Sequence, residues 1–299
     1  MNFLRKAIPE LKERIPLYKN AVFTSLTNSV FDKAVKAQKF ILPNGGRIFD
    51  TDFKALPDIL NLPFPEIVIE YSCHGLGGGL VEEQIGDAAV SAPNRIVFAT
   101  QETNFISVYT MVQYKTPTTY WVFMPYAASI TLKSSDNNFV SYPLVSPLVS
   151  KKPIIKTINN NFIGVSYYDI GDIAKQRLGD DWEKFAAMDL NDEIGAVLAL
   201  IEALSCKNVQ IEKLPVRKPN KTAAKRGALL FDEYSVLTIN RTNNNYAAVG
   251  GTHRSPREHL RRGHIRHLST GNIWVNSTVV SSNAGGKINK IYKLEKEAA

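Results

Sequence analysis

The stretch FISVYTMVQYKTPTTYWVFMPYAASITLK, residues 105–133, decides the fold class of this chain. It is rich in β-branched and aromatic residues, a composition that favours extended strands. The same character begins at Arg95, and the breaks between the apolar runs leave no room for crossover helices. Strands connected so closely form an antiparallel sheet or meander, which excludes a doubly wound nucleotide-binding fold over this region.

Helical periodicity precedes this predicted sheet. Apolar residues recur mostly at three- and four-residue spacing over residues 21–35, and Asn20 is placed to cap that helix. Pro9 and Pro16 divide the segment before it into short turns or kinked pieces. A further short helix is predicted over residues 52–60. The N-terminal part of the chain is therefore predicted to be largely helical.

A helix over residues 191–205 is the clearest in the chain. Its apolar positions form one face and its first turn is acidic, so we predict a core helix. The acidic approach to it, residues 180–193, is predicted to be a solvated face rather than a metal site. Strands are predicted at residues 67–71 and 162–168, and the stretch 136–161 is a candidate boundary. These elements predict an α+β fold with N-terminal helices, a mainly antiparallel β-sheet body, one buried helix and a C-terminal β-meander.

The charge of the chain is distributed unevenly. Residues 1–206 hold 19 Lys and Arg against 22 Asp and Glu, a net charge of −3, whereas residues 207–299 hold 17 against 6, a net charge of +11. We therefore predict a near-neutral α+β body, 1–206, and a basic, β-rich C-terminal module, 207–299. This module begins with a surface strap, residues 207–226, rich in lysine, arginine and proline. Such a charge balance suits a polyanion or an acidic protein face as the partner.

The cysteine count and the apolar segments limit the compartment. Cys73 and Cys206 cannot form a disulfide framework, and their spacing is not that of a zinc or redox motif. The sequence starts without the apolar core of a signal peptide, and its longest apolar stretch, residues 194–204, is too short to span a bilayer. We therefore expect a cytosolic protein with no membrane partner.

The C-terminal module contains the most distinctive chemistry. Four of the five histidines lie within residues 253–267, interleaved with five arginines. Imidazole changes its charge near neutral pH, and the guanidinium group matches phosphate and carboxylate in shape. This segment can therefore hold an anion or move a proton beside one.

Side chains alternate between two faces if residues 258–268 are extended. His264 then shares a face with Arg262 and Arg266. The opposite face carries His259, Arg261 and His267. A solvated edge strand whose charges prevent edge pairing is the alternative. We prefer a binding role, because a protective edge needs lysine or glutamate and has little use for so many histidines.

We predict that the module binds nucleic acid or another anion without a cofactor. The candidate side chains, from the strand and from the strap, are Arg257, His259, Arg261, Arg262, His264, Arg266, His267, Lys218, Lys221, Lys225 and Arg226. Metal binding is disfavoured, because the arginines repel a divalent cation and no cysteine lies nearby.

A metal-independent ribonuclease is an alternative for the same segment. RNA cleavage through the 2′-hydroxyl needs a base, an acid and a cation beside the phosphate. The groups for these roles are His264, His259 or His253, and Arg262 or Arg266.

Other motifs give weaker signals. The glycine-rich turn at residues 75–79 lacks the pattern of a dinucleotide fingerprint and the Lys-Ser/Thr of a P-loop, so we predict a hairpin or flap. The aromatic run at residues 120–126 has the residues to stack bases, but its hydrophobicity predicts a buried central strand. Trp274, across the predicted hairpin from the arginine-rich strand, is the better stacking candidate, and core packing is an equal alternative for it.

Residues 255–266, SPREHLRRGHIR, followed by IWV at 273–275 and VV at 279–280, carry a resemblance. They resemble the C-terminal signature of a widespread group of uncharacterised proteins encoded by tailed bacteriophages and prophages. The segment LPFP at 62–65, leading into the strand that ends at 70–71, is similar to the N-terminal feature of the same group. The resemblance implies a phage setting and a location in the host cytoplasm rather than a particular chemistry.

Three functions of different classes follow. The first, which we prefer, is a phage accessory protein that binds nucleic acid and is not an enzyme. The second is an inhibitor that covers the surface of a host antiviral, nucleic-acid-processing protein. The third is the metal-independent ribonuclease. The expected partner is nucleic acid or a host nucleic-acid-processing protein, and a homo-oligomer is compatible with each function.

Overall fold

The computed structural model describes the body of the chain and part of the C-terminal module. The residues described are 2–48, 61–73, 82–85, 88–103, 105–115, 118–133, 154–158, 161–214, 222, 224–226, 232–239, 259–261, 264–275 and 278–280. Within these ranges, the description is limited to the backbone for residues 82–92, 132–133, 154–164, 259–261 and 278–280.

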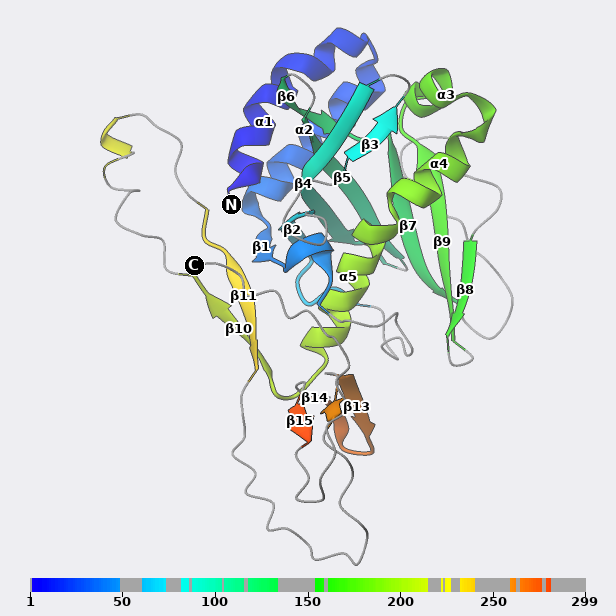
Figure 1. Cartoon of the computed structure of the whole chain (residues 1–299). Coiled ribbons are helices and arrows are strands. Elements are labelled where there is room, and N and C mark those ends of the chain that lie inside the picture. Colours follow the sequence, from blue (N-terminus) through cyan, green and yellow to red (C-terminus); the bar gives the residue numbers. More distant parts are fainter. Residues whose placement is uncertain are drawn as a thin grey trace, which may run out of the picture.

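An eleven-stranded sheet forms the centre of the molecule (Figure 1). Its strands are β1 (Gln38–Ile41), β2 (Glu66–Ser72), β3 (Glu82–Ile85), β4 (Ala88–Gln101), β5 (Phe105–Lys115), β6 (Thr119–Phe123), β7 (Tyr126–Lys133), β8 (Ile154–Ile158), β9 (Asn161–Asp169), β10 (Val209–Lys213) and β11 (Ser235–Ile239). Their order is β10-β11-β1-β2-β4-β5-β7-β9-β8, while β3 pairs with β4 and β6 with β5. Pairing is antiparallel except for β1 with β2 and β1 with β11, which are parallel. The predicted antiparallel sheet over residues 95–133 is confirmed.

Helices cover both faces of this sheet (Figure 1). One face packs against α1 (Phe3–Arg14), the 3-10 helix η1 (Ile15–Tyr18) and α2 (Ala21–Lys36). The other packs against α4 (Trp182–Asp189) and α5 (Asn191–Leu204), which follow α3 (Ile173–Leu178) and the 3-10 helix η3 (Gly179–Asp181). A short 3-10 turn, η2 (Asn44–Gly46), follows β1. The central strands are therefore buried on both sides, and the α+β class is confirmed.

The local signals in the sequence were correct for several elements. The Asn20 side chain accepts the backbone N–H of Phe23 at 2.9 Å, which caps α2 as predicted. Helix α5 and strand β9 lie where the periodicity placed them. Trp121 is buried, as predicted for the aromatic run, but β6 pairs only with β5 among the described strands and so is not the central strand expected.

Three predictions differ from the structure. Pro9 lies inside the continuous helix α1 instead of dividing it, whereas Pro16 is in η1, where the α-helical pattern ends. The acidic segment 180–193 is not simply a solvated face, because it forms η3 and α4 and ends at the buried Glu193. The candidate boundary 136–161 contains β8, which extends the main sheet beside β9. The helix predicted over residues 52–60 and the turn at 75–79 lie outside the described residues.

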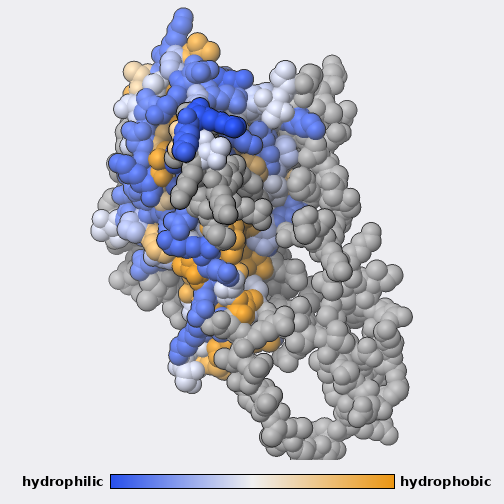
Figure 2. All heavy atoms as spheres, turned by 90° about the vertical axis from the view of Figure 1, so that its left-hand side faces the viewer, coloured by the Kyte–Doolittle hydropathy of each residue, from blue (hydrophilic) through white to orange (hydrophobic). Residues whose placement is uncertain are grey.

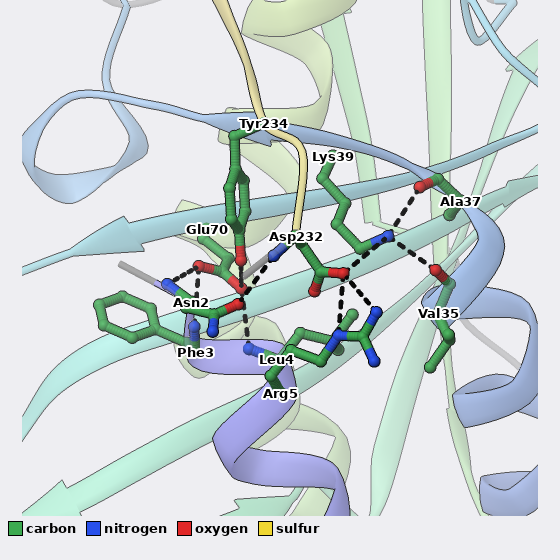
Figure 3. Close-up of polar contacts among 10 residues, drawn as sticks. All are labelled: Asn2, Phe3, Leu4, Arg5, Val35, Ala37, Lys39, Glu70, Asp232 and Tyr234. Carbon is green, nitrogen blue, oxygen red and sulfur yellow. Dashed lines mark hydrogen bonds and ion pairs between the residues drawn. The ribbon is translucent and has the colours of Figure 1, made fainter. Parts of the chain in front are cut away.

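The N-terminus of α1 is fixed by a carboxylate from the sheet (Figure 3). Glu70, in β2, is fully buried and accepts the backbone N–H groups of Asn2, Phe3 and Leu4 at 2.8–3.2 Å. Tyr234 donates its hydroxyl to the same carboxylate at 2.7 Å. A negative charge beside the free N–H groups of a helix N-terminus is favourable, so Glu70 acts as a cap supplied by another element.

A second carboxylate in the same region joins the strand β11 to the body (Figure 3). Asp232 lies 2.8 Å from a guanidinium nitrogen of Arg5 and 3.9 Å from Nζ of Lys39. The ammonium of Lys39 also donates to the backbone carbonyls of Val35 and Ala37. Burial lowers the pKa of Lys39, and the Asp232 charge opposes this shift. Because β10 and β11 extend the main sheet, the predicted division after residue 206 falls within one continuous sheet.

The outer strand β10 differs from the central strands in its exposure. Its burial changes from intermediate at Val209 to exposed over the following residues. Figure 2 shows the side of the molecule on which β10 and β11 lie. Hydrophilic residues cover most of its upper part, and apolar residues gather in the lower half. Ile211 of β10 and Leu268 of the C-terminal module are both 39% exposed, so apolar side chains remain accessible at this end.

Candidate functional site

The arginine- and histidine-rich segment forms one strand of a two-stranded hairpin. Strands β12 (His259–Arg261) and β13 (His264–Leu268) pair antiparallel with β15 (Thr278–Val280) and β14 (Gly271–Val275). Both ladders share one register, from His259 opposite Val280 to Leu268 opposite Gly271. A two-residue turn connects β13 to β14, as expected for a tight hairpin. The predicted hairpin that places Trp274 across from the arginine-rich strand is therefore confirmed.

The hairpin divides its charged side chains between two faces. His264 and Arg266 are opposite Val275 and Ile273, whereas His267 is opposite Asn272. Because directly opposite residues share a face and successive residues alternate, Arg266 and His267 project to opposite sides. The predicted pairing of His264 with Arg266 on one face, and the separation of His267 from them, are confirmed.

Hydrogen bonds attach the hairpin to the residues at the C-terminal end of α5. The Asn208 side chain donates to the backbone carbonyl of Trp274 at 2.7 Å and accepts its N–H at 2.8 Å. The backbone N–H of Lys207 donates to the carbonyl of Asn272 at 3.0 Å. The Asn272 amide reaches Ser205 Oγ at 3.1 Å. We name Ser205, Lys207 and Asn208 the anchor, because together they replace a neighbouring strand along the outer edge of β14.

Gly271 allows the hairpin turn to approach this anchor closely. Its φ is +118°, and a Cβ at this position would lie 2.6 Å from a side-chain carbon of Lys207. A side chain there would collide with Lys207 and adopt a conformation that L-residues rarely adopt. Lys207 itself is exposed, so the anchor adds a cation beside the turn.

The described arginine and histidine side chains of the hairpin are accessible to solvent. Arg266 and His267 are exposed, and His264 is partly exposed. Nδ1 of His267 lies 2.8 Å from the side-chain oxygen of Asn272, a contact that orients the ring. Within the described residues, no carboxylate lies within ion-pair distance of Arg266. Trp274 is partly exposed rather than part of the core.

The structure does not bring all of the predicted site residues together. Lys225 and Arg226 are exposed, but Figure 1 places residues 224–226 far from the hairpin, at the other end of the molecule. For His259 and Arg261 only the backbone is described. The remaining candidates lie outside the described residues: His253, Arg257, Arg262, Lys218 and Lys221.

A buried charged cluster on the α5 face of the sheet was missed by the sequence reasoning. Glu193 is 1% exposed, and one of its oxygens lies 3.6 Å from Nε of Arg95. Arg95 also lies 4.0 Å from Asp189, which accepts the Tyr126 hydroxyl at 2.6 Å. Both oxygens of Glu193, one guanidinium nitrogen of Arg95 and the hydroxyl of Tyr71 have no hydrogen-bond partner among the described residues.

The environment of Glu193 shifts its protonation. Burial raises the pKa of Glu193 to about 7, the Arg95 charge opposes this shift, and the Asp189 charge adds to it. The sequence did contain a signal, since Glu193 precedes Val197 and Ile201 at four-residue spacing on the apolar face of α5. Its position beside two other polar residues led us to place it at a solvated helix end.

The described residues contain no group of three His, Cys, Asp or Glu side chains placed to hold a metal ion. In the same part of the chain, no helix combines the length and apolarity needed to cross a membrane. Comparison with protein-family models, with curated proteins and with solved structures found no match for this chain.

Proposed function

We propose that this protein binds nucleic acid through the hairpin formed by residues 259–280, as an accessory protein in a phage setting. The observation that carries this proposal is an anchored hairpin that exposes an arginine and a histidine and contains no acidic residue. Arg266 and His267 are exposed on opposite faces, and residues 259–280 contain no aspartate or glutamate. The hairpin therefore presents the Arg266 guanidinium on one face and the His267 imidazole on the other, with no acidic residue of its own to neutralise the arginine.

A two-stranded ribbon of this kind matches the geometry of duplex DNA. The major groove is about 12 Å wide and admits a two-stranded antiparallel ribbon. One face of such a ribbon is turned toward the base edges, and its flanks lie beside the two phosphate backbones. The exposed guanidinium of Arg266 is the described group of the hairpin that is suited to pair with phosphate or with a base edge there.

The anchor supports the same interpretation. An isolated two-stranded hairpin is marginally stable in water. Three hydrogen bonds from Asn208 and Lys207 to the backbone of β14 fix this edge of the hairpin to the end of α5. In the described part of the chain, the hydrogen bonds between the anchor and the hairpin go to the β14 backbone and to the Asn272 side chain. They do not involve the exposed side chains of Arg266 and His267. The hairpin is thus held in a defined position while its charged groups stay accessible.

The test is the salt dependence of binding to a duplex of mixed sequence, measured by fluorescence anisotropy. We expect the logarithm of the binding constant to fall linearly with the logarithm of salt concentration, by about 0.9 for each phosphate contact. Replacing Arg266 with Gln should lower affinity on several sequences alike and reduce that slope by about one. The matched control is Lys184→Gln, which removes an exposed cation on α4.

Four outcomes would replace the proposal. Absent or salt-insensitive binding excludes a phosphate-based interface. Equal losses in Arg266→Gln and Lys184→Gln would show that only net charge matters. A stoichiometric protein partner that survives nuclease treatment in a pull-down from host lysate would favour the inhibitor of a host protein, and RNA cleavage that survives a chelator and is lost in His264→Ala would favour the ribonuclease.

A further inference from the structure

A hollow of about 390 Å³ opens at the edge of β6. In Figure 1, β6 lies at the opposite end of the molecule from the hairpin strands β13 and β14. It is lined by residues from α1 and η1, from β5 and β6, and from α3. The side chains that matter for its chemistry are Arg14, Tyr18, Tyr114, Tyr120, Tyr126 and Arg177.

The hollow exists because β5 has two different partners along one edge. The second half of β5 pairs with β6, and the first half pairs with β7. Strand β9 continues the sheet beyond β7 but ends with Asp169 opposite Tyr126. On this outer side of β6, the backbone N–H of Trp121 donates to the side chain of Glu10 at 2.9 Å instead of to a strand. The hollow lies where the edge of β6 meets the end of the β7–β9 pair, and residues of η1 and α3 line it.

The walls of this hollow are held in place by hydrogen bonds between elements. Asn20, which caps α2 just after η1, also donates its side-chain amide to the carbonyl of Gly171, just before α3. Gly171 has a φ of +76°, and a Cβ there would lie 2.8 Å from the Asn20 amide nitrogen. Tyr126 is fixed to Asp189 by its hydroxyl. A hollow whose walls are fixed in this way is preorganised for a ligand.

Aromatic rings and guanidinium groups alternate around the opening. The guanidinium carbon of Arg14 lies 5.1 Å from the centre of the Tyr120 ring, and that of Arg177 lies 4.7 Å from the centre of the Tyr18 ring. Tyr114 and Tyr120 are opposite each other in β5 and β6, with ring centres 6.0 Å apart. Tyr18, Tyr114 and Tyr120 are only partly buried, so each ring keeps accessible surface.

The two arginines differ in how far they are neutralised. Arg14 lies 3.4 Å from the carboxylate of Glu10. Arg177 is exposed, and in the described part of the chain no carboxylate lies within ion-pair distance of it. Its hydrogen-bond donors are therefore available to an anion, while the Tyr18 ring orients its guanidinium plane.

We propose that this hollow binds a nucleoside phosphate. The base stacks on the partly exposed tyrosine rings, which accept any base because every base has a π-face. The phosphate bonds to Arg177, and Arg14 adds a second cation at the rim. The volume is within the range of about 300–1,000 Å³ that small-molecule sites occupy. The site is separate from the hairpin, so it holds whether or not the hairpin binds nucleic acid.

The experiment is calorimetric titration of the full chain with adenosine and uridine 5′-monophosphates, with the matching nucleosides, and with inorganic phosphate. We expect at least one nucleotide to bind more tightly than its nucleoside and than phosphate. Arg177→Gln should weaken nucleotide binding by on the order of tenfold, the size expected for a charged hydrogen bond, and leave nucleoside binding unchanged. Tyr120→Leu should weaken binding of both nucleotide and nucleoside.

The matched control is Lys175→Gln, which removes an exposed cation from the same helix without touching the hollow. Arg266→Gln, in the hairpin, should also leave nucleotide binding unchanged. The proposal is overturned if neither nucleotide binds, if Lys175→Gln weakens binding as much as Arg177→Gln, or if the loss follows Arg266. Unchanged unfolding temperatures of the variants show that a loss of binding does not come from a loss of structure.

A further titration identifies the source of the ligand. A free nucleotide and the phosphorylated end of a nucleic-acid strand offer the same chemistry to the hollow. Tighter binding of adenosine monophosphate than of a 5′-phosphorylated penta-adenosine strand identifies a free nucleotide, and the reverse identifies a strand end. Both results support the site, whereas binding of the strand that does not depend on its 5′-phosphate or on Arg177 contradicts it.

Discussion

Two carboxylates are buried on opposite faces of the main sheet, and their surroundings differ. Glu70 faces α1 and accepts hydrogen bonds from three backbone N–H groups and one tyrosine hydroxyl. Glu193, on α5, faces the other side of the sheet, where its nearest cation is Arg95 at 3.6 Å. Neither oxygen of Glu193 has a hydrogen-bond partner among the described residues.

This difference shows that burial alone does not determine what a carboxylate does. Hydrogen-bond donors surround the carboxylate of Glu70 and replace the water that it loses on burial. The carboxylate thereby links the start of α1, strand β2 and Tyr234, which precedes β11. Glu193 lacks such donors, and burial raises its pKa to about 7. We therefore expect Glu70 to act as a structural link between elements and Glu193 to respond to protons near neutral pH.

The largest expected effect is that of Glu70→Ala. The change leaves the N–H groups of Asn2, Phe3 and Leu4 and the hydroxyl of Tyr234 without their acceptor. We expect the free energy of unfolding to fall by about 3–5 kcal/mol, the loss typical of breaking a buried charged network. Urea denaturation followed by circular dichroism measures it. A loss below about 1 kcal/mol would contradict the role of Glu70 as a helix cap.

Glu193→Gln should instead change how stability depends on pH. The folded state keeps the proton on Glu193 up to about pH 7, whereas the unfolded state releases it near the ordinary value of 4.5. The stabilising contribution of Glu193 is thus fully present below pH 4.5 and is lost as the pH rises to about 7. Glutamine does not titrate, so the variant should gain on the order of 2–3 kcal/mol relative to the natural chain between these two pH values.

Unfolding free energies of both proteins at several pH values within this window give the comparison. A difference that stays constant with pH would show that Glu193 keeps its charge in the folded protein. Glu66→Gln is the control, because Glu66 is only partly buried and its ion pair with Lys33 is solvated.

The smallest expected effect is that of Tyr234→Phe. The hydroxyl of Tyr234 is one of the four donors to Glu70, at 2.7 Å, and its removal leaves the three N–H groups in place. We expect a loss of about 1–2 kcal/mol in unfolding free energy. In the double variant with Glu70→Ala the loss from Tyr234→Phe should disappear, because the two groups act through one contact. Additive losses in the double variant would argue against that contact.

Local signals in the sequence predicted the elements whose structure depends on neighbours along the chain. The aromatic and β-branched runs of residues 105–133 predicted the central strands, and Asn20 predicted a helix start. Alternation along an extended strand predicted that Arg266 and His267 lie on opposite faces of the hairpin. Each of these results depends on residues only a few positions apart.

Contacts between distant segments were not predictable in the same way. The parallel pairing of β1 with β11 and the Arg5–Asp232 ion pair join residues far apart in sequence, and no periodicity indicates them. The charge imbalance instead suggested a division after residue 206, although the sheet continues past it. For the candidate site, alternation predicted the faces of the hairpin. The role of Asn208 as its anchor could not be inferred, because an asparagine in a loop has many local partners.

The contact between Arg5 and Asp232 also has a consequence for how the protein is made. The two residues are 227 positions apart, so the first helix leaves the ribosome long before its acidic partner has been translated. At elongation rates of about 5–20 residues per second, this interval lasts from roughly ten seconds to most of a minute. During this interval α1 lacks the ion pair with Asp232, so the link between the two ends of the chain forms only after residue 232 has been made.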